Sequence, residues 1–309
     1  MKFRRTVVSH AFLGIMLSFV WAHAQETKPT QITPTAGSQD NTELNTVLME
    51  STFRIEGRNV QNQSAMGTAF VMGRPCPSGT SNMAGKGRYV LITAAHVLQD
   101  IQGDTATLYL RQKVNETDWV RLPITVPIRM QGQPLWTKHP DADVAVMYVR
   151  LPEAAGIPLL STDLLADDKM LSEYGIHPGD NLECLGYPFG MESSDAGFPV
   201  LRSGKIASFP LLPTARTKTF LLDFLVFKGN SGGPVYMVES TRTYKQSTHL
   251  GTIYFIAGIV TEERSFSEQF IGQYSAEMHQ YQLGLAVVVH ASLIKEAIYM
   301  LPSPETLPN

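Results

Sequence analysis

Short apolar runs separated by turn residues dominate the chain from about residue 65 onward. β-Branched and aromatic residues are concentrated in these runs, and Gly, Pro, Asn and Asp interrupt them. This pattern is typical of β-strands rather than helices. The runs form two sets. The first covers residues 65–72, 89–92, 106–110 and 144–149, and the second covers 182–185, 200–206, 220–227, 234–238, 252–260 and 283–289.

Between the two sets, residues 151–179 show no regular alternation and contain several prolines and glycines, so we interpret them as a connection. After the second set, residues 291–301 carry apolar side chains at helical spacing, which predicts an amphipathic C-terminal helix. We therefore predict an all-β protein of two barrels and one helix. The first barrel covers about 49–150, and the second barrel with the helix covers 180–302.

The N-terminal residues have the three parts of a secretory signal peptide. Three basic residues within the first five positions precede an apolar run over 11–22, and the sequence Ala-His-Ala follows at 22–24. An uncleaved membrane anchor is the alternative, but this run is shorter than the roughly 20 residues needed to span a bilayer. We expect cleavage after Ala24, export to the periplasm or the medium, and no stable membrane insertion afterwards.

Residues 25–48 are dominated by Thr, Gln, Pro, Ser and Asn, and they contain few apolar side chains that could support a core. We interpret them as a linker or a propeptide. The folded domain is then expected over residues 49–302.

Composition and charge exclude several classes of function. The chain is 43% hydrophobic and 17% charged, which is ordinary for a globular protein. Its formal net charge is −3 and its only concentrated basic run is at the extreme N-terminus, so we expect no nucleic-acid partner. The eight histidines form no cluster with the spacing of a metal site. We therefore expect neither a metal nor another cofactor.

The two cysteines, Cys76 and Cys184, leave one disulfide open as an interpretation in an oxidising compartment. Cys76 lies in a loop rich in Pro, Gly and Ser, whereas Cys184 lies in an apolar, strand-like run. The alternative, which we favour, is a buried free thiol at 184 and a loop thiol at 76.

The strongest chemical signal is the segment 229–234, Gly-Asn-Ser-Gly-Gly-Pro. A serine attacks a carbonyl only when a base takes its proton, and the resulting oxyanion needs backbone N–H donors that a glycine-rich turn can present. Segment 229–231 would form this oxyanion hole, with Gly229 and Ser231 as the donors. A phosphate-binding loop is the alternative, but it would be followed by a helix, and residues 234–238 are typical of a strand.

With these residues, the chain resembles the trypsin-like serine proteases, and most closely their bacterial high-temperature-requirement type. An apolar strand runs into Thr-Ala-Ala-His at 93–96, and the Gly-x-Ser-Gly-Gly-Pro turn follows downstream. The resemblance extends over most of residues 60–300, through segments 67–70, 185–190, 202–206, 258–261 and 293–295 and through Asp223. It implies two six-stranded antiparallel barrels, serine endopeptidase activity and polypeptide substrates.

The resemblance also implies a catalytic triad in the chain order His, Asp, Ser. His96 would be the general base and Ser231 the nucleophile. Asp141 and Asp143 both stand between them in the sequence. Asp143 opens an apolar run and fits the family pattern, so we assign it as the acid that orients His96.

Departures from the family pattern are informative as well. Asn230 replaces the aspartate that pairs with a freed N-terminus in zymogen-type trypsins, so we expect activity without cleavage at a fixed N-terminus. Met237 stands where the family's partner for Cys184 would be, which favours a free Cys184. The chain also ends soon after the predicted helix, so we expect no appended peptide-binding module.

Leu225, Val226 and Thr261 are expected to line the primary substrate pocket, which would then favour small or medium aliphatic side chains. Glu262 and Glu263 could instead face a basic substrate residue, although solvated loop charges are the simpler interpretation. Two other functions stay open. An esterase would use the same triad, and a non-catalytic protein could use the cleft to hold polypeptides.

Overall fold

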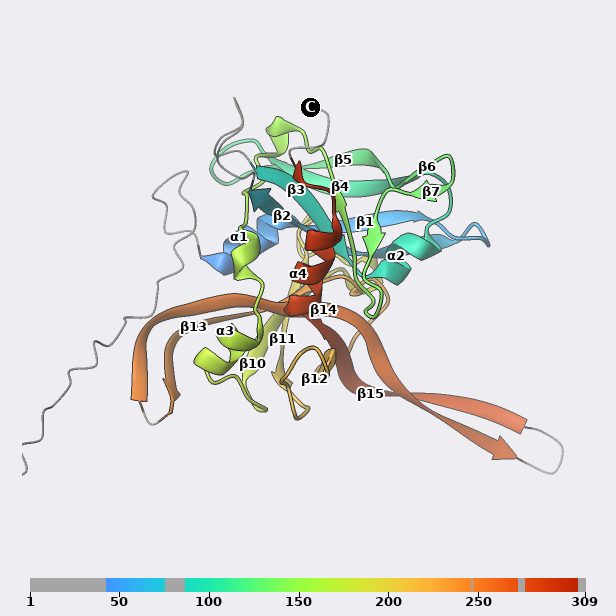
Figure 1. Cartoon of the computed structure of the whole chain (residues 1–309). Coiled ribbons are helices and arrows are strands. Elements are labelled where there is room, and N and C mark those ends of the chain that lie inside the picture. Colours follow the sequence, from blue (N-terminus) through green and yellow to red (C-terminus); the bar gives the residue numbers. More distant parts are fainter. Residues whose placement is uncertain (1–42, 76–86, 246, 272–275, 305–309) are drawn as a thin grey trace, which may run out of the picture. The chain divides into compact units, whose positions relative to one another are not determined.

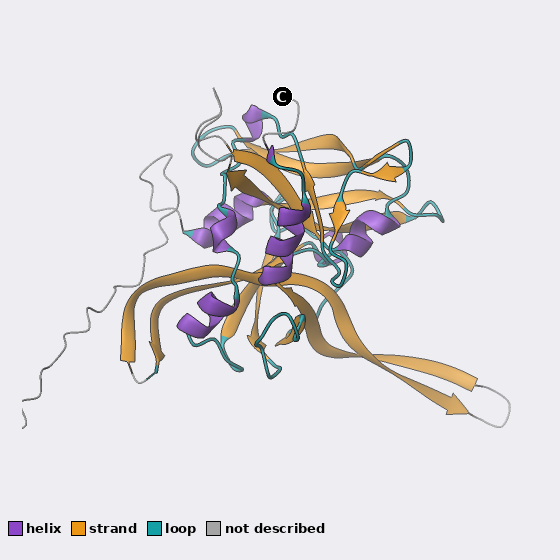
Figure 2. Ribbon diagram, viewed as in Figure 1, coloured by secondary structure: helices purple, strands orange, loops and turns teal. Residues whose placement is uncertain are grey.

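The computed structural model describes residues 43–75, 87–245, 247–271 and 276–304. The predicted signal peptide, residues 1–24, lies outside these ranges, as do Cys76 and most of the predicted linker. Figures 1 and 2 show a largely β structure in which short helices lie against the strands. No helix within the described ranges combines the length and the apolar character needed to cross a membrane.

The first half of the described chain forms a seven-stranded antiparallel sheet in the order β5-β4-β1-β2-β3-β9-β8. Its strands are β1 (Thr52–Arg58), β2 (Ser64–Pro75), β3 (Gly87–Thr93), β4 (Thr105–Lys113), β5 (Trp119–Pro127), β8 (Thr137–Lys138) and β9 (Ala145–Tyr148). A small two-stranded sheet, β6 (Arg129–Met130) with β7 (Gln133–Pro134), lies outside it. Helix α2 (Ala95–Asp100) directly follows β3.

The second half forms a closed six-stranded barrel in the order β10-β11-β12-β15-β14-β13. Its strands are β10 (Asn181–Gly186), β11 (Val200–Ile206), β12 (Thr219–Asp223), β13 (Pro234–Tyr244), β14 (Ser247–Ile271) and β15 (Ala276–His290). The connection between the halves contains helix α3 (Asp168–Glu173) and short 3₁₀ turns, and helix α4 (Ala291–Met300) ends the described domain.

The second predicted barrel and the C-terminal helix are confirmed. The other predicted barrel is only partly shown: the first half is a seven-stranded sheet rather than a six-stranded barrel, and its outer strands β5 and β8 are not paired with each other in the described part of the chain. Strand β8 is only two residues long. Its two residues pair with β9, and the sheet ends there.

Helix α1 (Leu44–Ser51) occupies the last residues of the predicted linker, 25–48. Leu44 and Leu48, one helical turn apart, are buried in a core cluster that also contains residues of both sheets and of α4. The folded domain of the described chain thus includes residues that we had placed in the linker. Two further clusters of buried hydrophobic side chains form the core of the first half and the interior of the barrel.

Strands β14 and β15 continue as a two-stranded ribbon well past the barrel (Figure 1). Their pairing runs from Gly258↔His290 to Ile271↔Ala276, with irregularities in register after Val260 and after Arg264. The apolar runs had predicted only the barrel parts of these strands, 252–260 and 283–289. The ribbon residues are mostly exposed and polar, so no hydrophobic alternation marks them.

Candidate active site

The segment 229–234 forms a tight turn between strands β12 and β13, and two of its glycines are required by the backbone. Gly229 has a φ of +100°, and a Cβ atom there would lie 2.1 Å from the carbonyl oxygen of Tyr187. Gly232 has a φ of +88°, and a Cβ atom would lie 2.1 Å from the carbonyl oxygen of Thr68. A side chain at either position would displace backbone. The turn can therefore hold Ser231 in this conformation only with glycines beside it.

Two threonines of the first sheet hold this turn. The Thr68 hydroxyl donates a hydrogen bond of 2.6 Å to the carbonyl oxygen of Gly229, and the Thr68 N–H donates one of 2.8 Å to the carbonyl oxygen of Ser231. The Thr93 hydroxyl in turn donates to the Thr68 carbonyl oxygen at 2.7 Å. Strands β2 and β3 thus fix the position of a turn that belongs to the second half of the chain.

His96 lies in the first turn of α2, directly after strand β3. Its ring nitrogen Nδ1 and its backbone N–H both contact Asp143. Its Nδ1 lies 2.5 Å from Oδ2 of Asp143, and its backbone N–H donates to Oδ1 at 3.0 Å. Both carboxylate oxygens are therefore engaged. This fixes the ring orientation and leaves Nδ1–H as the donor to the carboxylate, so Nε2 carries the free lone pair.

The same contacts shift both pKa values. Burial alone would lower the pKa of His96, but the hydrogen bond and charge of Asp143, together with the charges of Asp100 and Glu262, raise it above the ordinary 6.5. Burial also opposes ionisation of Asp143, yet the hydrogen bonds and charge of His96 lower the pKa of that carboxyl below 3.8. Both shifts mean that the charged forms, an imidazolium on His96 and a carboxylate on Asp143, stabilise each other.

Asp141, the alternative acid, points elsewhere. Its carboxylate forms an ion pair of 3.0 Å with Nζ of Lys218, and its backbone N–H donates to Nδ1 of His139 at 3.1 Å. Its pKa is lowered by the hydrogen bond and charge of Lys218. The structure thus pairs His96 with Asp143 and leaves Asp141 on the surface.

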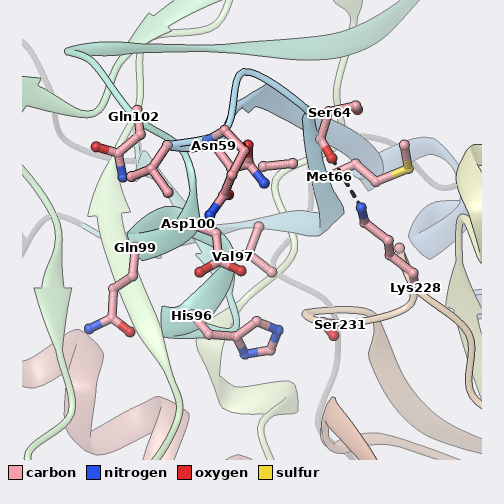
Figure 3. A pocket seen from close by; sticks show the side chains of 14 residues that line it. Asn59, Ser64, Met66, His96, Val97, Gln99, Asp100, Gln102, Lys228 and Ser231 are labelled. Carbon is pink, nitrogen blue, oxygen red and sulfur yellow. Dashed lines mark hydrogen bonds between the residues drawn. The ribbon is translucent and has the colours of Figure 1, made fainter.

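Ser231 and His96 border the same pocket (Figure 3). The Ser231 hydroxyl, however, donates a hydrogen bond of 3.0 Å to the carbonyl oxygen of Thr261. Among the described residues no hydrogen bond joins Ser231 to His96. The backbone N–H groups of Gly229 and Ser231 have no acceptor within the described chain, whereas that of the buried Asn230 donates to Phe227 at 3.0 Å. The first two remain available to an external oxygen.

The pocket has a volume of about 420 Å³. Its walls come from the β1–β2 hairpin, from α2, from Lys228 and from the turn 229–234. Lys228 crosses one side, where its Nζ donates to the Ser64 carbonyl oxygen at 3.1 Å, drawn as a dashed line in Figure 3. The lining residues are Asn59, Val60, Gln61, Ser64, Ala65, Met66, His96, Val97, Gln99, Asp100, Gln102, Lys228, Gly229 and Ser231.

No protein-family model matches the chain, and no curated protein matches its sequence. Several solved structures are similar to it. The protease Anisep from Arthrobacter nicotinovorans is 11% identical with a TM-score of 0.40, over 80% of this chain and 93% of that one. The thermostable serine protease AL20 from an extremophilic microorganism is 10% identical with a TM-score of 0.41, over 81% and 96%. The MamO protease domain from Magnetospirillum magneticum is 15% identical with a TM-score of 0.42, over 84% and 100%.

None of the three residues predicted for the primary pocket lines the pocket beside His96 and Ser231. Leu225 is 42% exposed, whereas Val226 is buried in the core of the barrel. Thr261 is buried too, and it contacts Ser231 through its carbonyl oxygen. Glu262 contributes its charge to the pKa of His96. Sequence reasoning missed the wall formed by the β1–β2 hairpin, because nothing in its polar residues signals a site.

Other chemistry has less support. No group of three or more His, Cys, Asp or Glu side chains in the described ranges is arranged to hold a metal ion. Cys184 is buried and forms no disulfide with another described residue, and burial raises the pKa of its thiol to about 12. At that pKa it stays protonated and is a poor nucleophile. The disulfide considered between Cys184 and Cys76 involves a residue, Cys76, that lies outside the described ranges.

Proposed function

We propose that this protein is a serine endopeptidase in which Ser231 is the nucleophile, His96 the general base and Asp143 the acid that orients it. The observation that carries the proposal is the bidentate contact of Asp143 with His96 at the pocket that Ser231 also borders. The glycine-rich turn supports it, because the N–H groups of Gly229 and Ser231 have no acceptor within the described chain.

The acylation step follows from these positions. As the Ser231 oxygen bonds to the substrate carbonyl carbon, its proton passes to Nε2 of His96, and Asp143 stabilises the imidazolium. The N–H groups of Gly229 and Ser231 stabilise the negative charge on the carbonyl oxygen. The imidazolium then gives its proton to the leaving amine as the C–N bond breaks. The product amine departs and an ester joins Ser231 to the acyl group.

Deacylation repeats the sequence with water. His96 takes a proton from water as the water oxygen bonds to the ester carbon, and it returns that proton to the Ser231 oxygen as the ester bond breaks. Before acylation the Ser231 hydroxyl has to turn away from the Thr261 carbonyl oxygen. The hydrogen bond between a catalytic serine and its histidine is often absent until substrate binds. The resting position of the Ser231 hydroxyl is therefore compatible with the mechanism.

The test is covalent labelling with a fluorophosphonate, which reacts with an activated serine, followed by peptide mass spectrometry. Label on Ser231 that disappears in Ser231→Ala and in His96→Ala supports the proposal. Ser64→Ala is a matched control, because Ser64 borders the same pocket but donates its hydroxyl to Glu56 at 2.9 Å. Label should persist there. A folded wild-type protein without label, or label that survives His96→Ala, contradicts the proposal.

Matched peptide and ester substrates separate an endopeptidase from an esterase that uses the same triad. Cleavage of the peptide supports the proposal, and cleavage of the ester alone replaces it with an acyl hydrolase. Binding of unfolded chains without cleavage of either substrate would favour the non-catalytic alternative.

Export is part of the same proposal, and it rests on the leader pattern in residues 1–24. The protein is expressed in a bacterial host with its complete leader, and the cell fractions are analysed by N-terminal sequencing. A mature chain that begins at Gln25 in the periplasm or the medium is expected. A full-length chain retained in the membrane would contradict it.

A further inference from the structure

Three arginines of the first sheet contact one segment of the second half, residues 187–198. Arg54 lies 3.6 Å from Glu192, and Arg121 pairs with the same carboxylate and donates to the Asp195 carbonyl oxygen at 2.8 Å. The third is Arg111 on β4. It donates to the Tyr187 hydroxyl at 3.1 Å and to the Gly197 carbonyl oxygen at 2.8 Å. Segment 187–198 is therefore held from the opposite half of the domain.

Arg111 is unusual among the three because it is only 2% exposed and has no carboxylate partner within the described chain. Its second guanidinium nitrogen donates to the carbonyl oxygens of Met49, Glu50 and Thr52 at 2.9, 3.1 and 2.7 Å. The guanidinium also lies over the Phe198 ring, 4.5 Å from its centroid. Burial lowers the pKa of Arg111, whereas its interactions with Tyr187 and the charges of Glu50 and Glu192 oppose that shift. The direct contacts of the guanidinium are with neutral oxygens and aromatic rings.

Segment 187–198 in turn supports the nucleophile turn. The Phe189 N–H donates to the Lys228 carbonyl oxygen at 2.7 Å, and the Phe189 ring lies 5.0 Å from the Phe227 ring. The Tyr187 carbonyl oxygen occupies the space where a Cβ of Gly229 would be. Any movement of residues 187–189 is therefore transmitted to the backbone that precedes the Gly229 N–H.

We propose that Arg111 is a positioning residue for the turn 229–234, which carries the N–H groups of Gly229 and Ser231. Arg111 positions this turn because its one guanidinium binds both residues 49–52 and Tyr187. This inference rests on the proposed function. Residues 49–52 end helix α1 and begin β1. Residues 49–52 would therefore help to hold the site in place through Arg111, although they do not contact the reacting atoms.

The test compares Arg111→Met with Arg74→Met. Arg74 also lies in the first sheet, and it also donates to a tyrosine hydroxyl and to several carbonyl oxygens. Its acceptors, however, are Tyr148 at 2.8 Å and residues of and after α4, at 3.1 Å for Ile298 and Leu301. Both variants lose a comparable network, but only Arg111→Met removes contacts to segment 187–198.

Two measurements are made on both variants. Hydrogen–deuterium exchange of peptides that cover residues 225–233 should be faster in Arg111→Met and unchanged in Arg74→Met. In peptide hydrolysis, Arg111→Met should lower kcat about tenfold, less than the 10²–10³ for outright loss of an oxyanion donor. KM should change less than about threefold, and the pH midpoint of kcat/KM should stay in place, because the pair of His96 with Asp143 is untouched.

Tyr187→Phe is the milder second variant, since it removes the hydroxyl that accepts from Arg111 and that also contacts the carbonyl oxygens of Thr52 and Gly197, two further acceptors of Arg111. It should show the same pattern with about a threefold loss of kcat. If Arg111→Met does not fold, Tyr187→Phe decides alone. Unchanged exchange over 225–233, or an equal loss of kcat in Arg74→Met, overturns the inference. Absence of fluorophosphonate label in wild type would refute the proposed function, whereas the exchange measurement still tests the role of Arg111.

Discussion

The Ser231 hydroxyl donates its hydrogen bond to the Thr261 carbonyl oxygen at 3.0 Å, and this contact joins the nucleophile turn to strand β14. The hydroxyl therefore occupies a resting position away from the imidazole. Rotation about one side-chain bond releases it, so substrate binding needs to change little else. The charge state of His96 in the free protein is consequently set by its other neighbours.

The first prediction concerns that charge state. Ser231→Ala should leave the pKa of His96 unchanged, because no hydrogen bond joins the two residues in the described structure. Asp143→Asn should lower the pKa of His96, since it removes a charge and replaces an ionic hydrogen bond. NMR titration of the His96 ring measures both, and activity of Asp143→Asn should fall about 10³-fold or more. A large shift in Ser231→Ala would show that the serine already bonds to the ring in solution.

Asp100 gives a second prediction, for the pH dependence of activity. Its charge raises the pKa of His96, and a general base acts only when it is neutral. Asp100→Asn should therefore lower that pKa and move the acid limb of the kcat/KM profile to lower pH. Asp104→Asn is the control, because Asp104 is exposed and is not among the charges that shift His96. A shift of equal size in both variants would contradict this assignment.

His290 should make the protein sensitive to acid. Its side chain is buried beside Phe220, and burial lowers its pKa to about 4, against an ordinary value of 6.5. The unfolded chain binds a proton at His290 more readily than the folded chain does. The contribution of His290 to the free energy of unfolding is therefore fully present above pH 6.5 and is lost as the pH falls toward 4. The loss from this residue is about 3 kcal/mol in the free energy of unfolding.

Urea denaturation at several pH values measures this effect. His290→Phe should flatten the dependence between pH 6.5 and 4, since phenylalanine takes no proton. An unchanged acid dependence in His290→Phe would assign the loss to other groups.

Cys184 should be inert in the folded protein. Its side chain is buried and its pKa is about 12, so the thiolate needed for alkylation is scarce. In a Cys76→Ser background, a thiol reagent should modify Cys184 only after denaturation. Fast modification of the native protein would contradict the buried position. In wild type, a peptide that links residues 76 and 184 through a disulfide would exclude the free thiol.

The sequence predicted those elements whose side chains have one apolar face. Residues 291–301 predicted a helix, and α4 buries Leu293, Ile294, Ala297 and Ile298. Strands of the barrel were recognised in the same way, as apolar runs bounded by turns. The residues predicted for the triad came from motifs, and the structure brings two of them, His96 and Asp143, into contact.

Other features carry no such signal. Helix α1 is eight residues long and follows a polar stretch, so its two buried leucines do not stand out as a periodic pattern. The ribbon residues of β14 and β15 whose burial the structure describes are mostly exposed, so hydrophobic alternation does not mark this part of the chain. Val226 belongs to an apolar run beside the nucleophile turn, but sequence spacing does not tell which side of the barrel wall a side chain occupies.

The bond from Thr68 to Gly229 joins positions 161 residues apart. Contacts at such separation form late, since a long stretch of chain has to be ordered before they close. For a protease of the kind proposed above, the first half holds the base and the second half holds the nucleophile. In a protease of that kind, a chain that is still being synthesised has no complete site, and activity begins only after the second half has folded against the first.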